Sequence, residues 1–167
     1  MKKFTLLAQL LLSVVIPGCG QKAFDKQLSL LYKKTVPFIR PTKLASEIKE
    51  NPNLILLDTR SPAEFAVSHL PKALFLNYDH FTLDQVKYIA PETPIVIYCS
   101  VGVRSENIGE KLLQAGYKNV RNLYGGIFAW KNEGHSVVNG ENILTDSVHT
   151  YNRYWAIWLK KGIKVYD

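Results

Sequence analysis

The stretch "PIVIYCSVGVRS", residues 94–105, decides the fold predicted for this chain. The continuous apolar run Ile95–Tyr98 is typical of a strand that is buried on both faces of a parallel sheet. Downstream, apolar residues recur at helical spacing over 105–115, and Gly116 is a suitable residue to end that helix. Cys99 therefore lies at the end of a buried strand that leads into a helix, which is where ligands bind in open α/β sheets.

The same alternation of strand and helix signals extends along the chain, which predicts an α/β fold with a central, mainly parallel sheet flanked by helices. The segment "SPAE", residues 61–64, has an N-cap serine, a proline at the first helical position and a capping-box glutamate. Thr42 is expected to cap another helix, and "TVPFIRP" is expected to form an edge strand because prolines limit its pairing. Further strands are expected at 53–58, 73–77 and 119–123, and further helices at 23–33, from 82 onward and after Gly125–Gly126.

Length and composition bound the possibilities. A chain of 167 residues is the size of one domain, with enough apolar residues to form a core without a disulfide or metal staple. The formal net charge is +7, but no block of five or more like charges occurs. We therefore expect scattered solvated lysines and no nucleic-acid partner. The spacing of the histidines suggests no metal site.

The first twenty residues have the features of a targeting segment. Lys2 and Lys3 precede an apolar stretch, 4–16, that is too short to span a bilayer and suits a signal peptide. The following "VIPGCG" resembles the lipobox of bacterial lipoproteins, in which the cysteine, here Cys19, receives the lipid. Pro17 is an unusual residue in such a motif, so ordinary cleavage after Gly20 and an uncleaved anchor are alternatives. All three place the folded part outside the cytoplasm, and the lipobox implies a periplasmic protein anchored to the membrane.

An aromatic stripe marks the end of the chain. Tyr151, Trp155 and Trp158 fall at helical spacing, which predicts a C-terminal aromatic helix packed on the domain. A helix lying in a membrane interface is the alternative. The resulting division of the chain is a signal peptide over 1–18, a lead-in segment over 19–35, a main domain over 36–138 and a C-terminal extension over 139–167.

Cys99 needs a reason to be unpaired. If Cys19 is lipidated or removed, Cys99 has no disulfide partner, and a free thiol in an oxidising compartment is a liability unless it is used or deeply buried. The loop that follows Cys99 favours a chemical role for its thiol. Backbone N–H groups of Ser100–Ser105 can form an anion-binding nest, Gly102 permits a positive φ, and the helix N-terminus adds partial positive charge. These features favour thiolate over thiol.

Several ordered motifs give the chain, over about 36–138, a specific resemblance to a single-domain rhodanese. The motif residues are Asp58 and Arg60 after a core strand, Glu64–Phe65, His69–Leu70–Pro71, the Cys99 loop, Gly125–Gly126 and Trp130. The resemblance implies a sulfurtransferase in which Cys99 attacks a sulfane donor such as thiosulfate, a persulfide or a polysulfide. Cys99 would then hold a persulfide and pass its sulfur to cyanide or a thiol. No cofactor is implied, and we expect a monomer.

The resemblance also implies roles for the residues around Cys99. The loop residues Ser100, Val101, Gly102, Val103 and Arg104 would bind the substrate anion, while Asp58, Arg60 and Ser105 would support the loop. Because Ser100 and Val101 are neutral, thiosulfate could be a poor donor. Two alternatives are a non-catalytic anion-binding scaffold and a phosphatase or arsenate reductase. The relatives with phosphatase activity carry Cys-x5-Arg, whereas the spacing here is Cys-x4-Arg.

Overall fold

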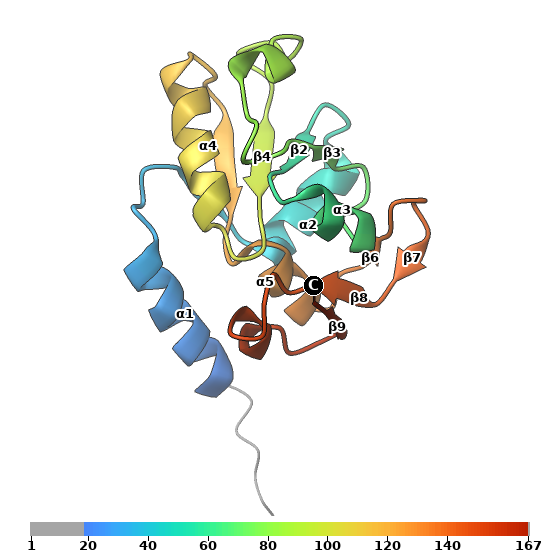
Figure 1. Ribbon diagram of the computed structural model, residues 1–167. Coiled ribbons are helices and arrows are strands. Elements are labelled where there is room, and N and C mark those ends of the chain that lie inside the picture. The colour runs from blue at the N-terminus through green and yellow to red at the C-terminus, as the bar shows by residue number, and fades with distance from the viewer. Residues whose placement is uncertain (1–18, 167) are drawn as a thin grey trace, which may run out of the picture.

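The computed structural model describes residues 19–166 of the chain (Figure 1). Residues 1–18 and Asp167 lie outside the described part, and so does the side chain of Cys19. The expected signal peptide falls on residues that the structure does not describe. Among the described helices, none is long and apolar enough to cross a membrane.

A five-stranded parallel sheet forms the centre of the molecule, as predicted. Its order is β1-β5-β4-β2-β3, so the strand that carries Cys99 at its end lies in the middle. The proline-flanked strand β1 lies at an edge, also as predicted. The strands are β1 (Phe38–Ile39), β2 (Ile55–Asp58), β3 (Leu74–Phe75), β4 (Ile95–Tyr98) and β5 (Val120–Leu123).

The helices agree with the sequence signals except at some of their ends. Ser61 and Glu64 form the capping box predicted for the short helix α3. Thr42, in contrast, does not cap α2, because that helix begins at Pro41 and follows Arg40 as its N-cap residue. The helices of the domain are α1 (Cys19–Leu31), α2 (Pro41–Glu50), α3 (Pro62–Val67), α4 (Val103–Gln114) and α5 (Gly126–Asn132), with a 3-10 turn η1 (Leu83–Val86).

Residues of β4 alternate between the two faces of the sheet, as strand geometry requires. Val96 and Tyr98 pack into a core with α1, α2 and α5, whereas Ile95 and Ile97 pack into a second core with α4 and η1. All four side chains are completely buried. Figure 1 shows the sheet between α4 and the helices α2 and α5. Layers on both faces explain why the strand has no polar residue.

The C-terminal extension differs from the prediction, because it contains no long aromatic helix. Strand β6 (Val137–Val138) directly precedes the extension. The extension contains strands β7 (Leu144–Thr145), β8 (Ser147–His149) and β9 (Ile163–Val165), with a single 3-10 turn η2 (Trp155–Trp158) among its described residues. The Asn132 side chain ends that turn, since it donates to the Trp158 carbonyl at 2.9 Å and accepts from the Lys160 N–H at 2.6 Å. Tyr151 has a left-handed backbone (φ 64°), which also excludes a continuous helix.

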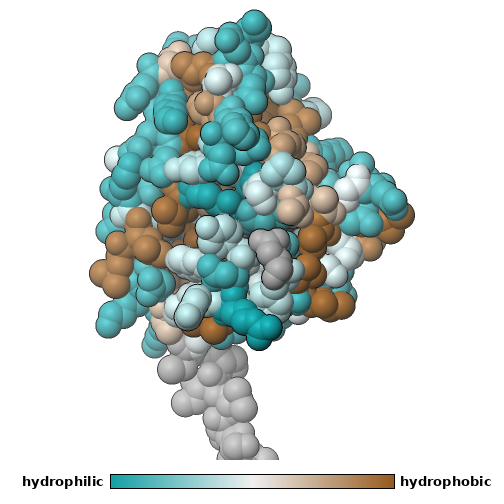
Figure 2. Space-filling model, viewed as in Figure 1, coloured by the Kyte–Doolittle hydropathy of each residue, from teal (hydrophilic) through white to brown (hydrophobic). Residues whose placement is uncertain are grey.

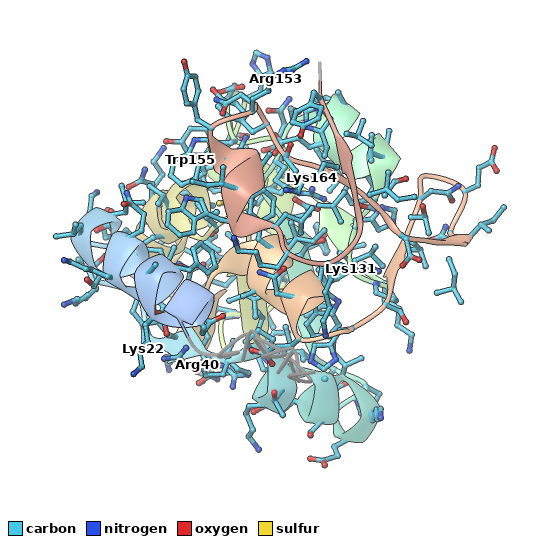
Figure 3. The ribbon with its side chains drawn as sticks, turned by 90° about the horizontal axis from the view of Figure 1, so that it is seen from below. Lys22, Arg40, Lys131, Arg153, Trp155 and Lys164 are labelled. Carbon is cyan, nitrogen blue, oxygen red and sulfur yellow. The ribbon has the colours of Figure 1, made fainter. Side chains whose placement is uncertain are left out.

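Trp155 and Trp158 of the extension nevertheless pack against the main core, as expected, whereas Tyr151 is 53% exposed. The Trp158 ring stacks on Phe24 of α1, with ring centroids 5.4 Å apart, and both residues join the main core. Figure 3, seen from below, shows η2 with Trp155 lying beside α1. In Figure 2 exposed apolar residues gather over α1 and over the hairpin of β6 and β7, where Leu30 and Leu144 are exposed.

Candidate active site at Cys99

Cys99 follows β4 directly, and its side chain is only 1% exposed. The backbone N–H of Gly102 points at its Sγ, with 3.1 Å between nitrogen and sulfur. The loop then enters the twelve-residue helix α4, whose N-terminus carries a partial positive charge. The sulfur thus lies among groups that stabilise negative charge.

Gly102 is required by the shape of the loop. Its φ of 101° lies in the left-handed region, and a Cβ there would fall on the hydroxyl of Tyr32. That hydroxyl donates to the Val101 carbonyl at 2.6 Å and accepts from the Gly125 N–H at 2.8 Å. The lead-in segment therefore braces the loop from outside the main domain.

The start of α5 holds the loop on another side. The N–H groups of Ile127 and Phe128 donate to the carbonyls of Cys99 and Ser100 at 3.0 and 3.2 Å. A Cβ on Gly126 would collide with the Cys99 carbonyl, so the double glycine lets two backbones approach closely. The Gly125–Gly126 motif thus has a packing function beside Cys99.

A buried pair of side chains fixes the beginning of α4. Ser105 donates its hydroxyl proton to Asn122 Oδ1 at 2.8 Å, and Asn122 Nδ2 donates to the Gly102 carbonyl at 2.7 Å. Both side chains are completely buried. Ser105 and its partner Asn122 of β5 therefore connect the start of α4 to the loop backbone at Gly102.

Arg104 is bound to a carboxylate. Its Nη1 and Nη2 donate to the Oε2 and Oε1 of Glu64 at 2.9 and 2.7 Å, which is a bidentate ion pair. Ser100 joins the pair, because its hydroxyl donates to Glu64 Oε1 at 2.7 Å and accepts from Arg104 at 3.0 Å. The expected loop cation is thus neutralised by Glu64, whose other contacts cap α3.

This network shifts the titration of both partners. Burial alone would raise the pKa of Glu64, but the hydrogen bonds and charge of Arg104 outweigh it and lower that pKa to about 2. Burial likewise opposes the charge of Arg104, yet hydrogen bonds to Glu64 and the nearby Cys99 raise the pKa of the guanidinium. The pair stays ionised at any ordinary pH.

Asp58 and Arg60 form a second, wholly buried ion pair, with 2.7 Å between Nη2 and Oδ2. Arg60 also donates to the Ser68 carbonyl, and its guanidinium lies 5.9 Å from the centre of the Tyr98 ring. The ion pair therefore lies against Tyr98, the residue that precedes Cys99. Thr59, between Asp58 and Arg60, contacts the backbone there directly, because its N–H and hydroxyl both donate to the Tyr98 carbonyl.

A cavity of about 220 Å³ opens above the loop. Cys99, Ser100 and Arg104 contribute to its lining, together with the apolar side chains of Val101 and Val103. Its other walls come from outside the main domain and are Leu31 of α1 and Tyr151 and Trp155 of the C-terminal extension. The cavity gives a small molecule access to a sulfur that is otherwise buried.

Of the predicted loop residues, the structure places Ser100, Val101, Val103 and Arg104 at the cavity with Cys99, and it adds residues that the sequence did not single out. Glu64 was predicted as a helix cap and as a residue of the family motif, but not as the partner of Arg104. Tyr32, Asn122 and the walls Leu31, Tyr151 and Trp155 were not assigned to the site. The aromatic stripe was the only sequence signal for the last two. Within residues 19–166, no group of His, Cys, Asp and Glu side chains has the arrangement of a metal site.

Comparison with known proteins identifies the family. A model of the rhodanese-like domain matches residues 41–133. A sulfurtransferase of Allochromatium vinosum is 37% identical over 98 residues, covering 59% of this chain and 91% of that protein. The thiosulfate sulfurtransferase GlpE of Tolumonas auensis is 32% identical over 88 residues, covering 52% and 81%.

A solved structure supports the same assignment. The crystal structure of a rhodanese-like domain protein from Staphylococcus aureus superposes with a TM-score of 0.53 at 28% identity, covering 59% of this chain and 94% of that one. The matched family model covers residues 41–133, so α1 and the whole C-terminal extension lie outside it. The chain belongs to the rhodanese-like domain family.

Proposed function

We propose that the protein transfers sulfane sulfur through a persulfide on Cys99. One observation carries the proposal, namely that Cys99 lines a cavity of about 220 Å³ at the N-terminus of α4. The sulfurtransferase names of the relatives in Allochromatium vinosum and Tolumonas auensis support the same chemistry.

The reaction consists of two displacements. The Cys99 thiolate attacks the outer sulfur of the donor, a bond forms between the two sulfurs, and the electrons of the broken bond leave with the rest of the donor. With thiosulfate the leaving group is sulfite. Cyanide or a thiolate then attacks the outer sulfur of the Cys99 persulfide, and the Cys99 thiolate leaves. Neither step needs an external oxidant or reductant.

The loop stabilises the charge in both steps. The Gly102 N–H donates to the sulfur at 3.1 Å, and the partial charge of the α4 N-terminus favours an anion at the same place. Cys99 is the catalytic residue of this scheme. Arg104, Glu64 and Ser100 are positioning residues, because they bind each other beside the sulfur.

Intact-mass measurement tests the proposal. After incubation with thiosulfate or inorganic polysulfide, the protein is expected to gain one sulfur atom and to lose it on addition of cyanide. Cys99→Ser should gain none, whereas Cys19→Ser, the matched control for the other cysteine, should behave like the wild type.

Two results would overturn the proposal. A protein that gains no sulfur from any donor would be a binding scaffold. A protein that releases phosphate from an aryl phosphate at a rate comparable with sulfur transfer would be a phosphatase. The ion pair of Arg104 with Glu64 favours sulfur transfer over phosphatase activity. Glu64 already accepts from the two guanidinium nitrogens that would otherwise bind a phosphate.

We also propose that the protein works outside the cytoplasm, anchored by a lipid on Cys19. The lipobox-like "VIPGCG" supports this proposal. Radiolabelled palmitate should enter the full-length chain in a bacterial host and should be absent from Cys19→Ala. If the wild type stays unlabelled while a known lipoprotein of the same cells is labelled, the proposed lipid anchor on Cys19 is refuted. Secretion with ordinary cleavage of the signal peptide is then the remaining explanation.

A further inference from the structure

The cavity above Cys99 has walls that the rhodanese-like domain does not supply. Leu31 lies at the end of α1, and Tyr151 and Trp155 belong to the C-terminal extension, all outside residues 41–133. Figure 3 shows Trp155 on η2, next to α1. Together with Val101 and Val103 of the loop, these three side chains make the cavity largely apolar.

Charge at the cavity is balanced. Apart from the reacting Cys99, Arg104 is the only charged residue among the described residues that line it, and Glu64 binds that arginine bidentately. The Tyr151 ring lies 5.4 Å from the Arg104 guanidinium and covers it further. Moving a dianion from water into such a site is costly, because no unpaired cation replaces its hydration.

The size of the cavity suits a ring. A cavity of roughly 150 Å³ lined by aliphatic and aromatic side chains holds benzene, and about 220 Å³ is available here. Cys99 is one of the lining residues, so an apolar group in the cavity would bring an attached sulfur atom next to this cysteine.

We propose that this cavity binds an uncharged, apolar organic substituent on the sulfur donor. The proposal rests on sulfur transfer by Cys99 and specifies the substrate class of that same site. The donor is an organic sulfane, R–SO2–S⁻ or R–S–S⁻, whose group R lies between α1 and the C-terminal extension. With a thiosulfonate, Cys99 thiolate takes the outer sulfur and the sulfinate R–SO2⁻ leaves with the bonding electrons.

Three donors test the proposal with cyanide as the common acceptor. Methanethiosulfonate and benzenethiosulfonate have the same charge and the same sulfane sulfur but differ in R, and thiosulfate replaces R by an oxyanion. We expect kcat/KM for benzenethiosulfonate to exceed that for methanethiosulfonate at least about tenfold, from burial of the ring. Thiosulfate should be the poorest donor.

Variants of the wall residues test whether these side chains cause the preference for benzenethiosulfonate. Trp155→Ala should reduce the ratio of the two thiosulfonates to within roughly threefold of one, because most of the ring would lose its contacts. Leu31→Ala, at the end of α1, should reduce the ratio less and replaces Trp155→Ala as the test if that variant fails to fold. Tyr154→Ala is the matched control, because this neighbour is 85% exposed and does not line the cavity. It should keep the wild-type ratio.

The outcomes separate this inference from the proposed function. A wild-type ratio near one, or a ratio that the wall variants leave unchanged, overturns the apolar donor even if Cys99 carries sulfur. Absence of a Cys99 persulfide with all three donors overturns sulfur transfer itself.

Discussion

Glu64 links three parts of the site through one buried carboxylate. Its Oε2 accepts the Ser61 N–H that begins α3 and a hydrogen bond from Arg104, and its Oε1 accepts from Arg104 and Ser100. A single side chain thus caps a helix and fixes two residues of the Cys99 loop. The loop arginine is held by the protein itself, so an anion at this site would meet backbone N–H groups rather than a free cation.

The contribution of the Glu64 carboxylate should be visible in how the free energy of unfolding depends on pH. The pKa of Glu64 is about 2 when folded against an ordinary value of 4.5, so its stabilisation is complete above pH 4.5 and is lost as the pH falls toward 2. The shift corresponds to about 3 kcal/mol, of which roughly 2 kcal/mol should be lost between pH 7 and pH 3. Urea unfolding at a series of pH values measures it.

The variant Glu64→Gln isolates that contribution. At pH 7 it should be less stable than the wild type, and the difference in free energy of unfolding should shrink as the pH falls from 4.5. Glu141→Gln, at an exposed position, is the control and should follow the wild type throughout. A constant difference between Glu64→Gln and the wild type from pH 7 to pH 3 would refute the assignment.

At this scale the sequence predicted the position of the loop better than its contacts. Cys99 and Gly102 could be assigned because strand, glycine and helix follow one another along the chain. The partner of Arg104 could not, since it lies 40 residues away and depends on how α3 and α4 face each other. Asn122 is a similar case, because an asparagine within a strand carries no local sign of the loop that it binds.

Elements with a dense local signal were predicted well. β4 and β2 are apolar runs buried by layers on both sides, and α3 has its full capping box. Ends of helices were less certain, because Pro41 and Val103 begin α2 and α4 without a side-chain cap. Their limits follow from the adjacent proline and the left-handed Gly102 instead.

The C-terminal aromatic stripe shows where periodicity fails. The helical spacing of this stripe does not give its residues a common environment. Tyr151 and Trp155 line the cavity, whereas Trp158 stacks on Phe24. Asn132 of α5 binds the Trp158 carbonyl and stops the turn there. Spacing correctly indicated that the segment is packed, whereas its backbone was decided by a tertiary contact that the local pattern does not contain.

At the scale of the whole molecule, the two terminal segments close over the Cys99 loop together. α1 and η2 lie side by side at the bottom of the molecule (Figure 1), and the Phe24 and Trp158 rings join them. Beyond this contact, Leu31 and Trp155 line the cavity, and Tyr32 binds the loop. The segments flanking the family domain therefore contribute both to the core and to the site.

A double-mutant cycle tests this coupling in the full chain. Phe24 is 2% exposed, so Phe24→Ala should lower the free energy of unfolding by about 3 to 5 kcal/mol, and Trp158→Ala should lower it by less, because that ring is only half-buried. Stacked rings couple by about 0.5 to 1.5 kcal/mol, so the double variant should lose less stability than the sum of the single variants by that amount. Leu30→Ala, on the exposed side of the same helix, should change stability by less than about 0.5 kcal/mol and show no coupling to Trp158→Ala. If Phe24→Ala and Trp158→Ala add without coupling, the two termini are stabilised independently and the cavity above Cys99 does not depend on their contact.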